Sequence, residues 1–240
     1  MDKLSTLFAI CDHGIEYHNV DGWVSYAFLE DESERKLKIF FQGSYQKEDW
    51  IANFWFFPVS KRPYKDMEIP YKVHSGFLEA WKKVEDLVIQ KITETVSERV
   101  FDSVKNKLVN DFKWKDITVV GYSHGAALSG LCTECVWFYR PDLRKEGMRG
   151  YGFESPRFFH GWKVRKDLRE RWENYTVIRV RGDIVTHLPP FLFRFCHVGR
   201  MIKLRGNKSL VEDKVPWFIK YHYPQVVLQA LLDAENKEIK

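Results

Sequence analysis

Residues 117 to 125 constrain the fold of this chain more than any other segment. A β-branched run, Ile-Thr-Val-Val, leads into Gly-Tyr-Ser-His-Gly at 121–125, and the small and apolar residues that follow suit a helix. Strand, sharp turn and helix in this order form a nucleophile elbow, in which the turn lifts the hydroxyl of Ser123 to where a base can reach it. The flanking glycines are expected because a β-carbon would clash where the strand and helix backbones crowd together.

Composition limits the classes of protein that need to be considered. The chain has 240 residues, 45% of them hydrophobic and 30% charged, as is typical of a globular protein. A chain of this length is expected to form one domain over residues 1–240. The net charge is +5, with Lys and Arg scattered beside Asp and Glu rather than gathered on one stripe, so we expect no nucleic-acid partner. The four cysteines lack the spacing of a disulfide framework or of a four-ligand zinc site.

The sequence also gives an expectation about location. No apolar run reaches the length of a membrane span. An acidic residue at position 2 and a short apolar patch make the N-terminus a poor signal peptide. The missing export signal favours a cytoplasmic location, while secretion of a mature form stays open.

Candidate strands and helices alternate along the chain. The strand candidates are Trp23–Leu29, Leu37–Gln42, Ile117–Gly121, Arg149–Phe153, Thr176–Arg181 and Phe193–Leu204. The helix candidates are Lys3–Tyr17, Gly76–Phe112 with a break near Thr93–Ser97, Ser123–Tyr139, Gly161–Glu173 and Trp217–Asn236. This alternation predicts an α/β fold whose central, mostly parallel sheet carries helices on both faces. In such sheets, functional residues gather beyond the carboxyl ends of the strands.

A serine nucleophile needs an imidazole base, and the base needs a carboxylate to hold its tautomer. On this kind of scaffold the chain order is Ser, then Asp or Glu, then His. The strand candidate at 176–181 ends at Gly182, and Asp183 follows at its carboxyl end. Asp183 is therefore the predicted carboxylate, and Glu154, at the end of the preceding strand candidate, is the alternative.

Three histidines follow Asp183 in the sequence. His187 comes soon after it, and two prolines then carry the chain away. His197 lies inside a strand candidate, which is typical of a hydrogen-bonded core histidine. His222 follows the last strand, at a loop or helix start, and is the predicted base, with His197 as the alternative.

An oxyanion hole needs two donors near the nucleophile. The residue after the serine, His124, would offer its backbone N–H. The strand candidate at 37–42 is followed by Gly43-Ser44, and Ser44 could supply both a backbone N–H and a hydroxyl.

With these residues assembled, the chain resembles the class 3 lipase family over roughly residues 25 to 225. The motifs that carry the resemblance, in chain order, are Phe41–Ser44, Asp49–Asn53, Val73–Phe77, Gly121–Gly125, Gly152–Arg157, Gly182–Pro190 and Cys196–Gly199. The resemblance implies an α/β-hydrolase fold. It also implies that Ser123 is the nucleophile, Asp183 the orienting acid and His222 the base, with Ser44 and the backbone of His124 as the oxyanion hole.

The chain departs from the family pattern at three places. Tyr223-Pro224 follows His222 where the family has a His-x-x-Tyr pattern, Gln42 stands where Arg is usual, and Thr186 stands where Pro is usual. Only the first of these departures bears on a proposed catalytic residue.

The aromatic segment at 49–59 is the candidate for a lid. Trp50, Phe54 and Trp55 lie just after Ser44 in the sequence. In the family, a lid at this place covers the site and opens at lipid. A buried helix or strand edge would give the same composition.

These observations predict a serine carboxylester hydrolase, first of all a triacylglycerol lipase. The alternatives are a phospholipase A1 or a soluble esterase or thioesterase and, last, a catalytically dead lipid-binding protein. We expect a lipid or small ester as substrate, transient contact with a membrane or lipid-droplet surface, and no metal or organic cofactor. The oligomeric state is left open.

Overall fold

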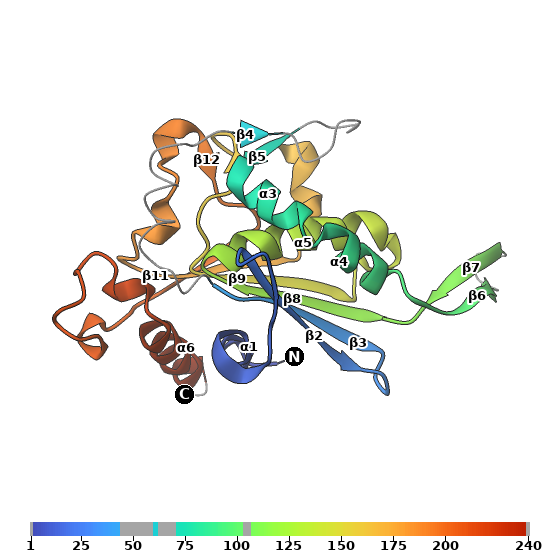
Figure 1. Cartoon of the computed structure of the whole chain (residues 1–240), viewed down its shortest axis with the longest axis horizontal. Coiled ribbons are helices and arrows are strands. Elements are labelled where there is room, and N and C mark those ends of the chain that lie inside the picture. The colour runs from blue at the N-terminus through green and yellow to red at the C-terminus, as the bar shows by residue number, and fades with distance from the viewer. Residues whose placement is uncertain (1, 44–59, 62–70, 103–106, 239–240) are drawn as a thin grey trace.

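The computed structural model describes residues 2–43, 60–61, 71–102 and 107–238. Their main feature is a seven-stranded sheet of order β1-β2-β3-β8-β9-β11-β13 (Figure 1). Its strands are β1 (His18–Val20), β2 (Val24–Asp31), β3 (Lys36–Phe41), β8 (Asp116–Tyr122), β9 (Met148–Phe153), β11 (Tyr175–Val180) and β13 (Arg200–Leu204). β1, β2 and β3 pair antiparallel, and every pairing from β3 to β13 is parallel.

Helices cover both faces of this sheet (Figure 1). α3 (Ser75–Lys82), α4 (Glu85–Ile92) and α5 (His124–Tyr139) lie on one face, and α1 (Leu4–Ala9) and α6 (Pro224–Glu238) lie on the other. Each face has its own apolar core, the first including Trp81 and Leu128 and the second including Phe8 and Val227. Burial on both sides explains why β8 is almost continuously apolar rather than alternating. The predicted α/β architecture is confirmed.

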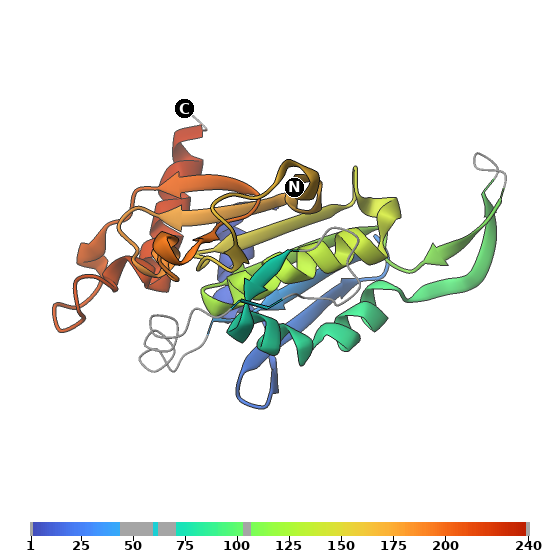
Figure 2. The same cartoon turned by 90° about the horizontal axis from the view of Figure 1, so that it is seen from above.

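Two smaller β structures accompany the main sheet. One is a four-stranded sheet of order β12-β10-β5-β4, formed by β4 (Ser60–Lys61), β5 (Lys72–His74), β10 (Phe159–His160) and β12 (Phe195–Cys196). The other is a hairpin of β6 (Thr95–Asp102) and β7 (Lys107–Phe112). Figure 2 shows this hairpin extending away from the body of the molecule.

The hairpin corrects the largest error of the sequence prediction, which made the segment 76–112 helical. The helical part ends at Ile92, close to the predicted break near Thr93–Ser97. Beyond it the sequence becomes rich in β-branched residues, which favour strands because they are stiff at χ1. Pairing of β6 with β7 then provides hydrogen-bond partners for the backbone N–H and C=O groups, which in a helix would bond to each other within the segment.

Two other predicted elements differ from the structure near the site. The expected strand Phe193–Leu204 is divided into β12 and β13, so His197 lies between two strands rather than inside one. The division occurs at Gly199, whose φ of +72° lies in the left-handed region. The expected helix Trp217–Asn236 begins as α6 only at Pro224, because proline has no N–H to donate inside a helix but suits its first turn.

Two further helix predictions were too long. The segment Lys3–Tyr17 contains α1 and then one wide turn over Ile10–Gly14, followed by extended backbone at Ile15. The segment Gly161–Glu173 contains only a 3₁₀ helix over Lys166–Trp172. The remaining short 3₁₀ helices are Pro141–Leu143, Val185–His187, Phe191–Phe193, Lys208–Leu210 and Lys220–His222.

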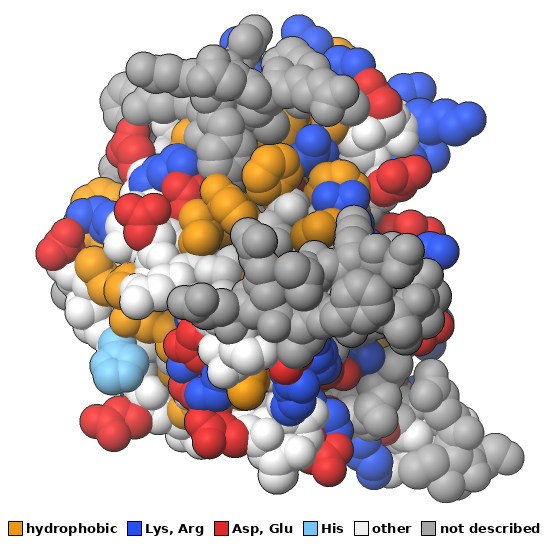
Figure 3. All heavy atoms as spheres, turned by 90° about the vertical axis from the view of Figure 1, so that its right-hand side faces the viewer, with side chains coloured by type: hydrophobic (Ala, Val, Ile, Leu, Met, Phe, Trp, Pro, Cys, Tyr) orange, Lys and Arg blue, Asp and Glu red, His pale blue; other side chains and the backbone are white. Residues whose placement is uncertain are grey.

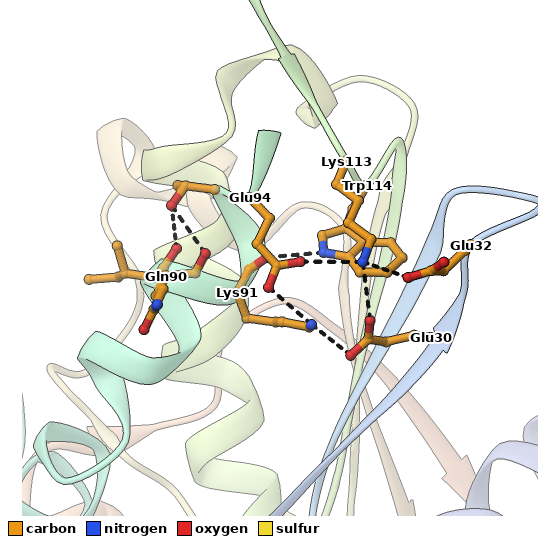
Figure 4. A network of polar contacts seen from close by, with 9 residues as sticks. Glu30, Glu32, Gln90, Lys91, Glu94, Lys113 and Trp114 are labelled. Carbon is orange, nitrogen blue, oxygen red and sulfur yellow. Dashed lines mark hydrogen bonds and ion pairs between the residues drawn. The ribbon is translucent and has the colours of Figure 1, made fainter. Parts of the chain in front are cut away.

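A polar network fixes the base of the hairpin to the sheet and to α4 (Figure 4). Lys91 Nζ lies 2.6 Å from a carboxylate oxygen of Glu30 and 3.1 Å from one of Glu94. Lys113 lies over the ring of Trp114, whose indole N–H donates to the carbonyl of Lys91 at 3.0 Å. Because these charges are partly exposed, each pair stabilises the fold by less than about 1 kcal/mol.

Arg140 joins the end of α5 to its neighbours. The guanidinium is fully buried and donates to the carbonyls of Ile92, at 2.8 Å, and Trp114, at 2.6 Å. It also pairs with Asp142 at 2.7 Å. This arrangement satisfies carbonyls at the end of α4 and just after the hairpin, and it holds the C-terminal end of α5 in place.

The face at the hairpin end carries charges of both signs. Figure 3 shows Lys and Arg side chains next to Asp and Glu side chains over this face, with apolar side chains between them. Among the side chains that Figure 3 colours, the basic ones form no continuous stripe. None of the described helices is both long enough and apolar enough to cross a bilayer.

Candidate active site

The parallel register of the sheet brings three polar residues to one edge. Ser123 follows β8 directly, Glu154 follows β9 directly, and Asp183 comes shortly after β11. Tyr122 and Phe153, the last residues of β8 and β9, are register partners. The side chains that follow these strands therefore meet beyond the carboxyl ends, where α/β sheets place their sites.

The turn at Ser123 has the strained geometry expected of an elbow. Ser123 has φ 56° and ψ −122°, a conformation that non-glycine residues rarely adopt. A β-carbon at Gly121 would lie 2.1 Å from the carbonyl oxygen of Gly125, and one at Gly125 would lie 2.2 Å from that of Phe41. Only glycine fits at these two positions, as the sequence argument expected. The N–H of Ser123 donates to the carbonyl of Phe153 at 2.9 Å and helps to hold the turn.

A linear series of hydrogen bonds runs from Ser123 through His222 to Asp183. Nε2 of His222 lies 2.7 Å from Oγ of Ser123, and Nδ1 lies 2.8 Å from Oδ2 of Asp183. All three side chains are buried. Because a carboxylate only accepts, Nδ1 carries the proton and donates to it, which leaves Nε2 to accept from the serine hydroxyl.

The carboxylate of Asp183 is held from its own loop. Oδ1 accepts the N–H of Val185 at 2.9 Å, and the hydroxyl of Thr186 donates to the backbone carbonyl of Asp183 at 2.9 Å. Burial alone would raise the pKa of Asp183, but the net shift is downward because His222, Glu154 and the N–H of Val185 favour the charged form. Asp183 is therefore an ionised acceptor at neutral pH.

Tyr122 supports the histidine and was missed by the sequence analysis. His222 ends the 3₁₀ helix Lys220–His222, just before α6. The ring of Tyr122 stacks on the imidazole with centroids 5.4 Å apart, and its phenolic hydroxyl donates to the backbone carbonyl of His222. Tyr122 occupies the variable position before the serine of the elbow. Its place next to Ser123 in the sequence is the one signal that could have identified it.

The other two histidines form different contacts. His197 Nε2 donates to the carbonyl of Thr186 at 2.8 Å, and burial lowers the pKa of His197 to about 3, so this ring is neutral. Nδ1 of His187 lies 3.0 Å from the backbone carbonyl of Asp183. Within the described part of the chain, the hydrogen bonds of Ser123 Oγ involve neither ring.

The predicted oxyanion hole lies only partly within the described residues. His124 is the first residue of α5, where backbone N–H groups have no acceptor within the helix. Its imidazole is buried, and this burial, together with nearby His74, lowers the pKa of His124 to about 4. Ser44 lies outside the described residues, so its role stays a prediction. The lid candidates Trp50, Phe54 and Trp55 also lie outside them.

Glu154, the alternative carboxylate, is adjacent to the site. Its side chain is fully buried, and Oε1 accepts the N–H of Val180 at 2.7 Å. Glu154, Asp183 and His222 each place one oxygen or nitrogen within 4.8 Å of the others. Such a group could in principle ligate a metal ion, but the hydrogen bonds of Asp183 and His222 already account for their geometry.

Residues 38–193 match the model of the class 3 lipase family. Among curated proteins, the chain is 28% identical to a lipase of Rhizomucor miehei over 180 residues, which cover 73% of this chain and 44% of that protein. It is 26% identical over 179 residues to a protein of Fusarium solani named secreted mono- and diacylglycerol lipase 1, covering 74% and 46%. The chain thus spans less than half the length of these two relatives.

Solved structures show the same fold. One, described as a triacylglycerol lipase with a serine protease triad at its catalytic centre, superposes with a TM-score of 0.60 at 24% identity, covering 81% of this chain and 67% of that one. Lipase II from Rhizopus niveus gives a TM-score of 0.58 at 18% identity, covering 80% and 66%. At these identities the structures establish the fold and nothing finer.

The family match includes Ser123 and Asp183 but ends before His222, so only the geometry described above places that histidine at the site. The name of the Fusarium protein includes the word secreted, and the expected cytoplasmic location therefore gains no support. From the extent of the family match and the shared fold, the chain is a member of the class 3 lipase family with an α/β-hydrolase fold.

Proposed function

We propose that this protein is a serine carboxylester hydrolase, and specifically a lipase that cleaves acylglycerols. The observation that carries the proposal is the series Ser123 Oγ–His222 Nε2 and His222 Nδ1–Asp183 Oδ2, at 2.7 and 2.8 Å, on a strained elbow at the carboxyl edge of the sheet. A serine, a base and an orienting carboxylate in this geometry are the parts that acyl transfer requires.

The reaction follows from the positions of the protons. Ser123 Oγ attacks the ester carbonyl carbon while its proton passes to Nε2 of His222, and Asp183 stabilises the resulting imidazolium. The tetrahedral intermediate collapses, and the leaving alcohol takes the proton from Nε2, which leaves an acyl-serine. Water then attacks the acyl carbonyl carbon and gives a proton to Nε2. The second tetrahedral intermediate collapses, Oγ of Ser123 takes that proton back from Nε2, and the free acid leaves.

The oxyanion of each intermediate needs donors near the serine. The backbone N–H of His124 is adjacent to Ser123 at the start of α5, where the helix dipole also favours negative charge. Ser44 is the proposed second donor. Loss of one donor lowers turnover by about 10²–10³-fold in enzymes of this kind.

Apolar side chains on the surface support a lipid substrate. Phe191, Leu192 and Phe193 form a short 3₁₀ helix after the Asp183 loop, and Leu192 is 83% exposed. Trp162 is about half-exposed, and its ring centroid lies 4.9 Å from that of Phe191. The guanidinium of Arg194 lies 5.8 Å from the ring centroid of Trp162. An apolar patch bordered by cations suits transient contact with a membrane or lipid-droplet surface.

Hydrolysis of p-nitrophenyl esters of increasing chain length, as monomers and as emulsions, tests the proposal. We expect the wild type to prefer emulsified long-chain esters, and Ser123→Ala and His222→Ala to lose nearly all activity. His197→Ala is the matched control, because it removes a partly buried histidine that does not bond Ser123.

Two outcomes would contradict different parts of the proposal. If a fluorophosphonate probe labels neither wild type nor Ser123→Ala, the protein is no serine hydrolase, and a lipid-binding role remains. If the labelled enzyme cleaves only monomeric short esters, it is an esterase and the lipase assignment fails.

A further inference from the structure

Glu154 is a buried carboxyl group that the reaction described above does not use. It follows β9 directly and is fully shielded from solvent. Its backbone has φ 51°, in the left-handed region, which a residue such as glutamate rarely occupies. Strained backbone of this kind persists only where the surrounding structure holds it, and such positions cluster at functional sites.

The contacts of Glu154 are specific. Oε1 accepts the N–H of Val180 at 2.7 Å. Among the described residues no donor hydrogen-bonds Oε2, although this oxygen is buried. The Asp183 carboxyl group lies within hydrogen-bonding distance of the Glu154 side chain, and Arg179 on β11 is the charged neighbour beyond it. His222 bonds the same Asp183 carboxyl group through Nδ1, and each of the three residues places one oxygen or nitrogen within 4.8 Å of the others.

Two adjacent buried carboxylates repel each other, so the pKa of one of them rises. Asp183 faces Nδ1 of His222, so the negative charge is stabilised there. Burial, and then the charge of Asp183, raises the pKa of Glu154 well above its ordinary value, against smaller opposite effects of the Val180 N–H and Arg179. This shift favours the protonated form of Glu154.

We propose that Glu154 is a positioning residue that acts as a neutral carboxylic acid, accepting the Val180 N–H through one oxygen and donating its O–H to Asp183. This bond fixes the carboxylate that faces His222 and gives it a third donor, besides Nδ1 of His222 and the N–H of Val185. The inference rests on the proposed hydrolase function, because it concerns the residue that orients the base.

Two substitutions separate the hydrogen bond from the shape of the side chain. In Glu154→Gln the amide oxygen can accept from Val180 and the amide N–H can donate to Asp183, as the neutral acid does. Glu154→Leu keeps a similar volume but removes both bonds. Glu134→Gln is the matched control, because Glu134, on α5, is also a buried carboxyl but pairs with Arg171 of the 3₁₀ helix Lys166–Trp172, away from the triad.

The experiment measures kcat, KM and the pH profile of kcat/KM on a monomeric ester, with the folded state of each variant checked by circular dichroism. We expect Glu154→Leu to lower kcat about 10- to 100-fold with little change in KM, as for loss of a hydrogen bond to a charged group. Glu154→Gln should recover most of that loss without moving the acid limb of the profile. Glu134→Gln should lower stability and leave the profile as in the wild type.

The downfield proton NMR signal of the His222–Asp183 hydrogen bond gives a second readout that does not depend on turnover. We expect this signal to keep its position in Glu154→Gln and to shift in Glu154→Leu, because only leucine alters the donors to Asp183.

Three results would overturn the inference. If Glu154 is ionised in the wild type, Glu154→Gln removes a negative charge near His222 and moves the acid limb to lower pH. If Glu154→Leu folds and keeps wild-type kcat, or if glutamine and leucine impair kcat equally, the hydrogen bond has no positioning role. Failure of the proposed function would look different, since the wild type itself would then escape fluorophosphonate labelling.

Discussion

Replacing Asp183 by asparagine tests the orientation of the base with the smallest change of shape. Asp183 accepts two N–H groups, from Nδ1 of His222 through Oδ2 and from Val185 through Oδ1. An asparagine has one acceptor oxygen and cannot satisfy both. If its NH₂ faces His222, Nδ1 must accept, so Nε2 carries the proton and cannot take one from Ser123. If its oxygen faces His222, its NH₂ faces the N–H of Val185. Two donors then meet, and neither the NH₂ nor the Val185 N–H has an acceptor.

The expected loss follows from these contacts. Converting a charge-assisted hydrogen bond to a neutral one costs about 1–2 kcal/mol, and an unsatisfied buried N–H costs about 1–3 kcal/mol. Losing the carboxylate also removes the stabilisation of the imidazolium in the transition state, so the barrier rises by about 3–6 kcal/mol in all. At about 1.4 kcal/mol per factor of ten, kcat should fall about 10²- to 10⁴-fold.

The assay is kcat on a monomeric p-nitrophenyl ester, together with the rate of fluorophosphonate labelling. Asp116→Asn is the control, because Asp116 lies at the opposite end of β8 from Ser123 and pairs with Arg149 there. We expect this control to label at the wild-type rate. A folded Asp183→Asn protein that keeps more than about a tenth of wild-type kcat would refute the assigned tautomer.

Three further predictions concern stability. Gly125→Ala would place a β-carbon 2.2 Å from the carbonyl oxygen of Phe41. We therefore expect the free energy of unfolding in urea to fall by about 1–3 kcal/mol and the fluorophosphonate probe to label the variant poorly. A variant with wild-type stability and labelling would contradict the crowding argument. Arg140→Met leaves two buried carbonyls without their donor and should cost about 2–5 kcal/mol in the same assay while kcat at low temperature stays unchanged; a smaller loss would mean that water replaces the guanidinium. The raised pKa of Glu154 means that the folded state binds more protons than the unfolded state. The free energy of unfolding should therefore fall as pH rises from the ordinary pKa of 4.5 toward the raised one, by at most about 1.4 kcal/mol per pH unit. Urea midpoints against pH should show this slope reduced in Glu154→Gln, and equal slopes in both proteins would show that Glu154 is already ionised.

The sequence predicted the strands of the main sheet best. The run at 117–121 and β8 agree to within a residue at each end, because a strand buried on both faces is apolar throughout and bounded by turn residues. The hairpin of β6 and β7 was not predicted. Its backbone hydrogen bonds join residues of two different segments, and the spacing of apolar residues within one segment does not show which other segment it pairs with. The prediction that residues 1–240 form a single domain stays a prediction.

The site residues differ in how much local information identifies them. Ser123 is marked by its own pentapeptide, and Asp183 by its place after a strand, whereas His222 was chosen by comparison with two other histidines. The structure brings these three side chains within hydrogen-bond distance, and their catalytic roles stay predictions until turnover is measured. Tyr122 could not be assigned to the site from the sequence, because its partner His222 lies 100 positions further along the chain.

Glu154 shows why a list of candidate carboxylates does not determine their roles. From the sequence it competes with Asp183 for one position, since each follows a strand. The register of β9 and β11 instead places both at the site, and only Asp183 reaches His222. An ionised Glu154 would repel Asp183, and an apolar residue would leave the Asp183 carboxylate without this donor. A protonated carboxylic acid meets both requirements, so the protonation of Glu154 follows from the same strand register that assembles the site.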